Sequence, residues 1–206
     1  MPRCSKLNRL FAAVALTVAA FPALAQQPQP SLVRGAIESV DDDTMTVKSR
    51  EGTSVKLHMP GSVGVTGVAK TSLANIKVGS FIGATSVPEA DGTEKAVEVH
   101  VFTENMRGTG EGSRPYDLLP KSSMTNATVD RTTAAANGGQ SLTLKYKNGE
   151  KKVLVGPDTP VVAFVPGTKS ELKSGAQVIA FAMKRSDGSL ETRRVLVGRD
   201  GLTPPM

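Results

Sequence analysis

Cysteine, histidine and aromatic residues are scarce in this chain of 206 residues, and each scarcity excludes a class of function. The single cysteine is Cys4, so the rest of the chain can form no disulfide, thiolate metal site or cysteine nucleophile. Aromatic residues make up 4% of the sequence, which leaves few stacking platforms for single-stranded nucleic acid. Two histidines and no G-x-S-x-G motif argue against acid–base and serine-triad chemistry. We therefore expect no enzyme, no catalytic residue and no cofactor.

Long apolar runs are also rare, and the one that stands out lies near the N-terminus. Residues 10–20 are apolar except for Thr17, and three basic residues precede them. The run is too short to cross a hydrocarbon core of about 30 Å. The Ala-Leu-Ala at residues 23–25 has the small-x-small pattern that signal peptidase cleaves. We therefore expect residues 1–25 to be the cleaved signal peptide of a periplasmic protein whose mature chain has no transmembrane span.

An internal repeat relates the two halves of the remaining chain. Short blocks of sequence recur in the same order at a spacing of 96 or 97 residues. Such register over several blocks indicates one domain present twice. The matching blocks are MTVK 45–48 and LTLK 142–145, IKVG 76–79 and LKSG 172–175, and the Asp-Gly pairs at 91–92 and 187–188.

Each copy alternates apolar and polar residues in the manner of half-buried strands, as in the series Val97, Val99 and Val101. Gly52 and Gly149 suit hairpin turns, and SLANIKVG and SELKSG predict a short helical turn in each copy. The pattern predicts an all-β protein with two tandem small β-barrels of five or six strands each. The expected domains are a first barrel at residues 32–103, a Gly/Pro-rich connector at 104–124, a second barrel at 125–200 and a tail at 201–206.

The run VRGAIESVDDDTMTVKSREG, followed by ANIKVG, a DG hairpin and a Val-rich last strand, resembles a small secreted bacterial β-barrel domain of unknown function. The linker MRGTGEGSRPYDL, the restart MTNATV and the end GRDGLTPPM resemble a proteobacterial family of periplasmic proteins with two such domains. The resemblance implies barrels of the oligonucleotide/oligosaccharide-binding-like kind and no established activity. Some members carry a metal-transporter permease label, which a chain without membrane spans cannot justify.

The two copies differ in charge, and this difference suggests a binding surface. Residues 33–104 carry 7 Lys and Arg against 10 Asp and Glu, whereas residues 125–206 carry 12 against 7. If the basic residues of the second copy share one barrel wall, that wall can hold a polyanion; an ordinary solvated surface explains them too. The candidates are Lys145, Lys147, Lys151, Lys152, Lys184, Arg185, Arg193 and Arg194.

The leading hypothesis is a non-enzymatic binding or scaffolding protein for an anionic envelope component or a protein partner, with nucleic acid not expected. The alternative is metal-ion binding. His58 and His100 each stand between apolar residues of an expected strand and should face outward, His100 beside Glu98. Two imidazoles and a carboxylate can bind Zn²⁺ or Cu²⁺, although two solvated histidines fit the same pattern. The ligand, the oligomeric state and the orientation of the barrels stay open.

Overall fold

The computed structural model describes residues 30–135 and 138–206, and the predicted all-β class is confirmed. The expected signal peptide lies outside the described residues. The described helices are three-residue 3₁₀ turns, and none is long and apolar enough to cross a membrane. The strands are β1 (Ser31–Val40), β2 (Thr44–Ser49), β3 (Ser54–His58), β4 (Gly64–Lys70), β5 (Phe81–Pro88), β6 (Glu94–Val101), β7 (Gly112–Pro115), β8 (Ser123–Ala134), β9 (Gln140–Tyr146), β10 (Gly149–Val155), β11 (Val161–Pro166), β12 (Gln177–Lys184) and β13 (Leu190–Gly198). The 3₁₀ turns are η1 (Leu73–Asn75), η2 (Glu104–Met106) and η4 (Lys169–Glu171).

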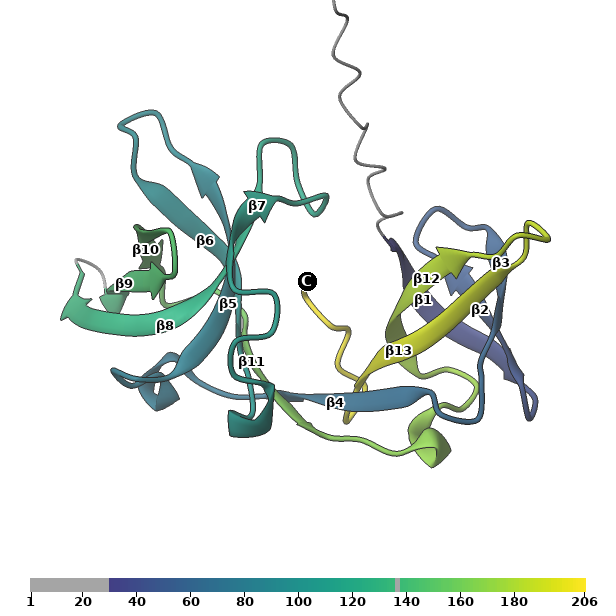
Figure 1. Cartoon of the computed structure of the whole chain (residues 1–206). Helices are drawn as coiled ribbons and strands as arrows, with labels where there is room; N and C mark the ends of the chain where they lie inside the picture. Colours follow the sequence, from purple (N-terminus) through teal and green to yellow (C-terminus); the bar gives the residue numbers. More distant parts are fainter. Residues whose placement is uncertain (1–29, 136–137) are drawn as a thin grey trace, which may run out of the picture.

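The strands form one continuous sheet in which two sets of five strands close on themselves (Figure 1). Ring 1 runs β1-β2-β3-β13-β12 and returns to β1. Ring 2 runs β5-β6-β10-β9-β8 and returns to β5. Strands β4 and β11 pair antiparallel with each other between the rings, and they also pair with β13 and β6, respectively.

Each ring takes strands from both sequence repeats, which corrects the expectation that each repeat forms its own barrel. The first repeat gives β1–β3 to ring 1 and β5–β6 to ring 2. The second gives β8–β10 to ring 2 and β12–β13 to ring 1. The two repeats thus exchange their last hairpins. The reason is that β4 and β11 stay extended, pair with each other and carry the chain across to the opposite ring.

Apolar alternation places a core inside each ring, as the sequence pattern predicted. Successive inward side chains are two positions apart along each strand, and burying each Val, Leu or Ile contributes about 1.5–3 kcal/mol. The core of ring 1 includes Ile37, Met45, Val47, Leu57, Val178 and Val195. The core of ring 2 includes Ile82, Ala84, Val99, Leu142, Leu144 and Val153.

Four β-bulges bend the strands into rings. A bulge adds one residue to a strand and increases its local bend and twist, as closure requires. Two bulges add their extra residue to the first strand of a repeat, β1 or β8, and two add it to the last strand, β6 or β13, so the curvature repeats with the sequence. The register shifts occur at Ile37/Ser39 and Val129/Arg131, and at Thr85/Ser86 and Ala180/Ala182.

A third apolar cluster fills the space between the rings and is completed by the connector and the tail. The connector at residues 104–124 is ordered, because η2 lies within it and β7 pairs with β8. The tail at 201–206 has no regular secondary structure, yet it ends between the rings (Figure 1) with Met206 only 3% exposed. The buried members are Val68, Phe81, Phe102, Met124, Val162, Phe164, Ile179, Leu196 and Met206.

The exchange of hairpins predicts which engineered cysteines can form a disulfide. In a Cys4→Ser background, Ser31→Cys with Ala182→Cys should cross-link on mild oxidation, because these residues are partners across β1 and β12. Such partners lie about 4.5–5.5 Å apart at Cα, within disulfide reach. Non-reducing electrophoresis measures the product.

The matched control joins Ser31→Cys to Ser86→Cys, since Ser86 occupies the position of the first repeat that is equivalent to Ala182. This pair should stay reduced, because β5 belongs to ring 2 whereas β1 belongs to ring 1. Cross-linking of the control pair, without cross-linking of the first, would show that each repeat closes its own ring.

Candidate functional site

A cavity of about 120 Å³ lies between the two rings, and we call it the central pocket. Its walls come from β6 and β8 of ring 2, β12 and β13 of ring 1, the crossing strand β11, the connector and the tail. Its floor is the outer face of β6 and β8, which turns away from the core of ring 2. No single repeat supplies all of these elements, so the pocket exists only in the exchanged arrangement.

A buried carboxylate and imidazole lie side by side beneath the pocket. Glu98 has no exposed surface and accepts a hydrogen bond of 2.6 Å from the hydroxyl of Thr85. The second oxygen of Glu98 lies 3.2 Å from Nδ1 of His100. The ring of His100 stacks on Phe164, with centroids 4.9 Å apart and planes at 26°. These contacts commit Nδ1 to Glu98, and Nε2 makes no hydrogen bond to any described residue.

Asn126 projects from β8 on the same face, and its amide is only half satisfied. Its Nδ2 donates to the carbonyl of Thr109 at 3.0 Å, which fixes the orientation of the amide. Its Oδ1 is buried and has no hydrogen-bond partner among the described residues. Since buried acceptors in proteins are nearly always paired, this atom is an acceptor that the described protein groups leave available in the pocket.

Gly83 explains why these two polar atoms come so close to the sheet. It lies on β5 between His100 on β6 and Asn126 on β8, and it is the register partner of both. A Cβ at this position would lie 2.1 Å from Nε2 of His100 and 2.7 Å from Oδ1 of Asn126. Only glycine leaves this gap open, and both polar atoms border it.

Two arginines from opposite rings reach the central pocket. Arg194, on β13, lies with its guanidinium carbon 4.6 Å from the centroid of Phe181. Burial lowers the pKa of Arg194, but an arginine remains charged at physiological pH. Arg114, on β7, is exposed and donates to the carbonyl of Gly110 at 2.9 Å. Neither guanidinium forms an ion pair within residues 30–135 and 138–206, so both can bind an anion.

Arg34, on β1, holds ring 1, the connector and the tail together beside the pocket. Its guanidinium donates to both carboxylate oxygens of Asp117, at 2.7 and 3.0 Å. It also donates to the hydroxyl of Tyr116 at 3.2 Å and to the main-chain oxygen of Met206 at 3.0 Å. The hydrogen bond from Arg34 lowers the pKa of Asp117, whereas burial raises the pKa of Tyr116.

The basic residues expected on one wall are divided between the two rings. Lys145, Lys147, Lys151 and Lys152 belong to ring 2, and Lys184, Arg185, Arg193 and Arg194 belong to ring 1. The expectation of a single wall is corrected, because it assumed that the second repeat folds by itself.

Several of these basic groups are also already paired. Lys151 contacts Glu94 at 3.2 Å, and both Arg185 and Arg193 contact Glu191. Of the eight candidates, Arg194 lines the central pocket. The structure thus retains one of the predicted residues for an anion site and adds Arg114, which the sequence interpretation had assigned to a connector.

Two of the three predicted metal candidates, His100 and Glu98, lie side by side, but His58 is not brought to them. His58 lies on β3 of ring 1, 3.9 Å from Asp43, whereas His100 and Glu98 lie on β6 of ring 2. His100 is 4% exposed rather than facing solvent, because the outer face of β6 is covered by the crossing strand β11 and by the cluster between the rings. No group of three or more His, Cys, Asp or Glu side chains in the described ranges is placed to hold a metal ion.

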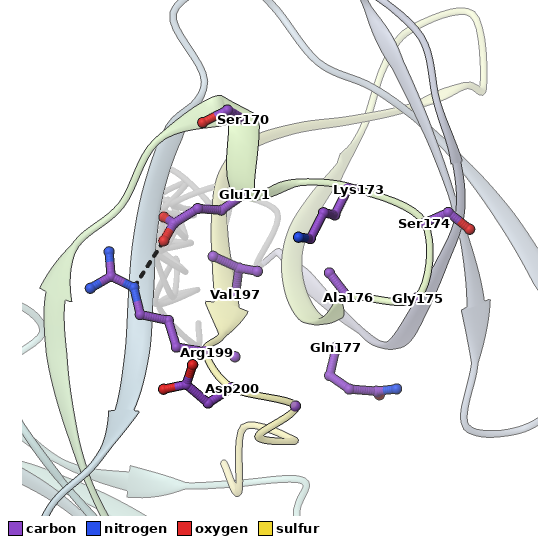
Figure 2. Close-up of a pocket in the computed structure, with 12 residues that line it drawn as sticks. Ser170, Glu171, Lys173, Ser174, Gly175, Ala176, Gln177, Val197, Arg199 and Asp200 are labelled. Carbon is purple, nitrogen blue, oxygen red and sulfur yellow. Dashed lines mark hydrogen bonds and ion pairs between the residues drawn. The ribbon is translucent and has the colours of Figure 1, made fainter.

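A second cleft, larger and more open, lies beside η4 and the end of β13 (Figure 2). Glu171 and Arg199 point toward one another there, with Oε1 and Nε 2.9 Å apart. Arg199 also donates to the carbonyl of Pro166 at 2.6 Å. Since its main charges neutralise each other, this cleft offers a ligand less than the central pocket does.

Comparison with known proteins adds no assignment: no family model, curated protein or solved structure matches the chain. The chemistry of the central pocket therefore carries the functional argument. Among the described residues, that pocket combines two guanidinium groups without ion pairs, one buried acceptor without a partner (Oδ1 of Asn126) and an aromatic lining.

The ion pair of Arg34 predicts how stability depends on pH. Because the pKa of Asp117 is lower in the folded protein than its ordinary 3.8, its contribution is present above about pH 4 and is lost as the pH falls through the folded value. Asp117→Asn should therefore lower the free energy of unfolding by about 0.5–1 kcal/mol at pH 7, since the carboxylate is largely exposed. Urea unfolding at pH 7 and pH 3 measures the difference, which should shrink at pH 3.

Asp130→Asn serves as the control, because Asp130 is exposed and makes no hydrogen bond or ion pair through its side chain within the described part of the chain. Its effect should be close to zero at both pH values. Equal effects of the two variants at pH 7 would contradict a specific role for the contact between Arg34 and Asp117.

Proposed function

We propose that this protein is a non-enzymatic binding protein that receives a small anionic group in the central pocket. The observation that carries the proposal is the convergence of Arg194 from ring 1 and Arg114 from the strand attached to ring 2, neither of them ion-paired within the described residues. A partly buried cation without a counter-ion is electrostatically unfavourable, and an anion placed beside it removes that cost. Guanidinium groups bind carboxylates and phosphates through paired hydrogen bonds.

The size of the cavity limits the ligand. A volume of about 120 Å³ corresponds to about four water molecules at ~30 Å³ each. It lies well below the roughly 300–1,000 Å³ of pockets that enclose drug-sized molecules. The pocket therefore suits an oxyanion of a few atoms, such as a carboxylate or phosphate. This group is either a free small molecule or the exposed end of a larger envelope component.

The proposed location is the periplasm, on the strength of the signal-like residues 1–25 and of the resemblance to two-domain periplasmic proteins of the oligonucleotide/oligosaccharide-binding-like kind. An envelope offers both sources of anionic groups, free metabolites and lipid headgroups. The internal repeat is part of the proposal, because the ligand would contact residues from both copies and so fix the two rings relative to each other.

Substitution of the two arginines tests the proposal. Arg114→Gln and Arg194→Gln should each weaken binding of acetate and inorganic phosphate by about tenfold or more, because a hydrogen bond to a charged group contributes ~1.5–3 kcal/mol. Calorimetry measures the affinities, and the rise in melting temperature with added anion provides a second readout. Binding should also weaken with added sodium chloride.

Arg193→Gln is the matched control, since it removes the same charge at the residue next to Arg194. The side chain of Arg193 is exposed and pairs with Glu191. It should change affinity less than twofold. If it weakens binding as much as Arg194→Gln, the effect is a long-range surface field and the pocket is not the site. Vesicles of phosphatidylglycerol, compared with phosphatidylcholine vesicles, separate a lipid headgroup from a free anion as the source.

A further inference from the structure

Asn126 shows that an anion alone does not complete the central pocket. Its side chain is only 5% exposed, and the hydrogen bond from Nδ2 to Thr109 identifies Oδ1 as the remaining acceptor. That oxygen has no partner among the described residues. A carboxylate or phosphate dianion cannot satisfy it, because such groups only accept hydrogen bonds. The complete ligand must therefore bring a donor to this side of the pocket.

His100 adds a second acceptor beside the first. Nδ1 of His100 lies 3.2 Å from a carboxylate oxygen of Glu98, and the ring tautomer that donates this hydrogen bond carries its hydrogen on Nδ1. The other ring nitrogen, Nε2, is then an acceptor as well. Two acceptors cannot bond to each other, which agrees with the lack of a hydrogen bond between Nε2 and Asn126. Both atoms border the gap over Gly83 that a Cβ would fill.

We propose that the ligand is a small α-amino acid, and this inference rests on the proposed function. Its ammonium group donates to Asn126 and His100. Its carboxylate binds Arg114 and Arg194, which line the same pocket. An ammonium carries three donors and can satisfy both acceptors, whereas a hydroxyl carries one donor.

The cavity restricts the side chain of this amino acid. Within about 120 Å³ there is room for the ammonium, the carboxylate and a methyl-sized substituent, at ~30 Å³ per water-sized group. The proposed class is therefore a free amino acid of the size of glycine or alanine.

Three ligands of equal size test the donor directly on the unmodified protein. L-alanine, L-lactate and isobutyrate differ only in the ammonium, hydroxyl or methyl group next to the carboxylate. Calorimetry should give affinities in the order alanine, lactate, isobutyrate, with alanine about tenfold or more tighter than isobutyrate. Equal affinities for the three would overturn the inference and show that water satisfies Asn126, while the proposed anion site would stand.

A pair of variants assigns the preference to its residue. Asn126→Leu removes the acceptor and should bring the affinities for alanine and isobutyrate within about threefold of each other. Gln140→Leu is the matched control, because Oε1 of Gln140 is the other unpartnered buried acceptor in the described chain and does not line the pocket. It should keep the preference for alanine. If Asn126→Leu also keeps that preference, the donor is bound elsewhere and the inference is wrong.

Failure of the inference and failure of the proposed function are distinguishable. If only the inference fails, isobutyrate still binds as well as alanine, and Arg194→Gln weakens both. If the proposed function fails, none of the three ligands binds and the arginine variants behave as the unmodified protein. An α-amino acid that binds with unchanged affinity to Arg194→Gln would also contradict both, because its carboxylate would lie outside the central pocket.

Discussion

The antiparallel pairing of β4 with β11 is the constraint on which the rest of the molecule depends. These two strands stay extended and pair with each other, so the chain leaves each ring before that ring is complete. Each ring must then be closed by a hairpin from the other repeat. The same pairing fixes the spacing of the rings, and with it the position of the face on which Glu98, His100 and Asn126 lie. The site is a product of the crossing and not of either barrel.

This arrangement gives ring 2 two buried faces with different chemistry. The inner face of β6 carries Val99 into an ordinary apolar core. The outer face carries a carboxylate and an imidazole, which in an isolated barrel would be open to water. Covered by β11 and the cluster between the rings, they are desolvated and hydrogen-bonded instead. A polar pair of this kind fixes the orientation of its members, and this pre-organisation lowers the cost of binding a ligand.

The sequence predicted the strands, the hairpin turns and the two inner cores, because these depend on local alternation and on glycine positions. It could not predict which hairpin closes which ring, since Ser86 and Ala182 are equivalent positions and either hairpin has the pattern that a ring requires. His100 was placed outward for a related reason: alternation tells which residues share a face, but not whether another element covers that face. Arg194 was identified as an anion-binding candidate by its charge alone. Asn126, one polar residue in a buried strand, was not identified as a site residue.

Ring 1 brings together the two ends of the described chain, and this has a consequence for the order of folding. Ring 2 uses strands from a continuous stretch of sequence, whereas Ser31 pairs with Ala182 and therefore waits for nearly the whole chain. During synthesis the N-terminal part emerges first, yet the edges of β1 and β3 remain open until β12 and β13 exist. Such long-range pairing slows folding, and open strand edges invite association with other chains. Nascent β1–β3 is thus the segment of this protein that most needs shielding before its partner hairpin arrives.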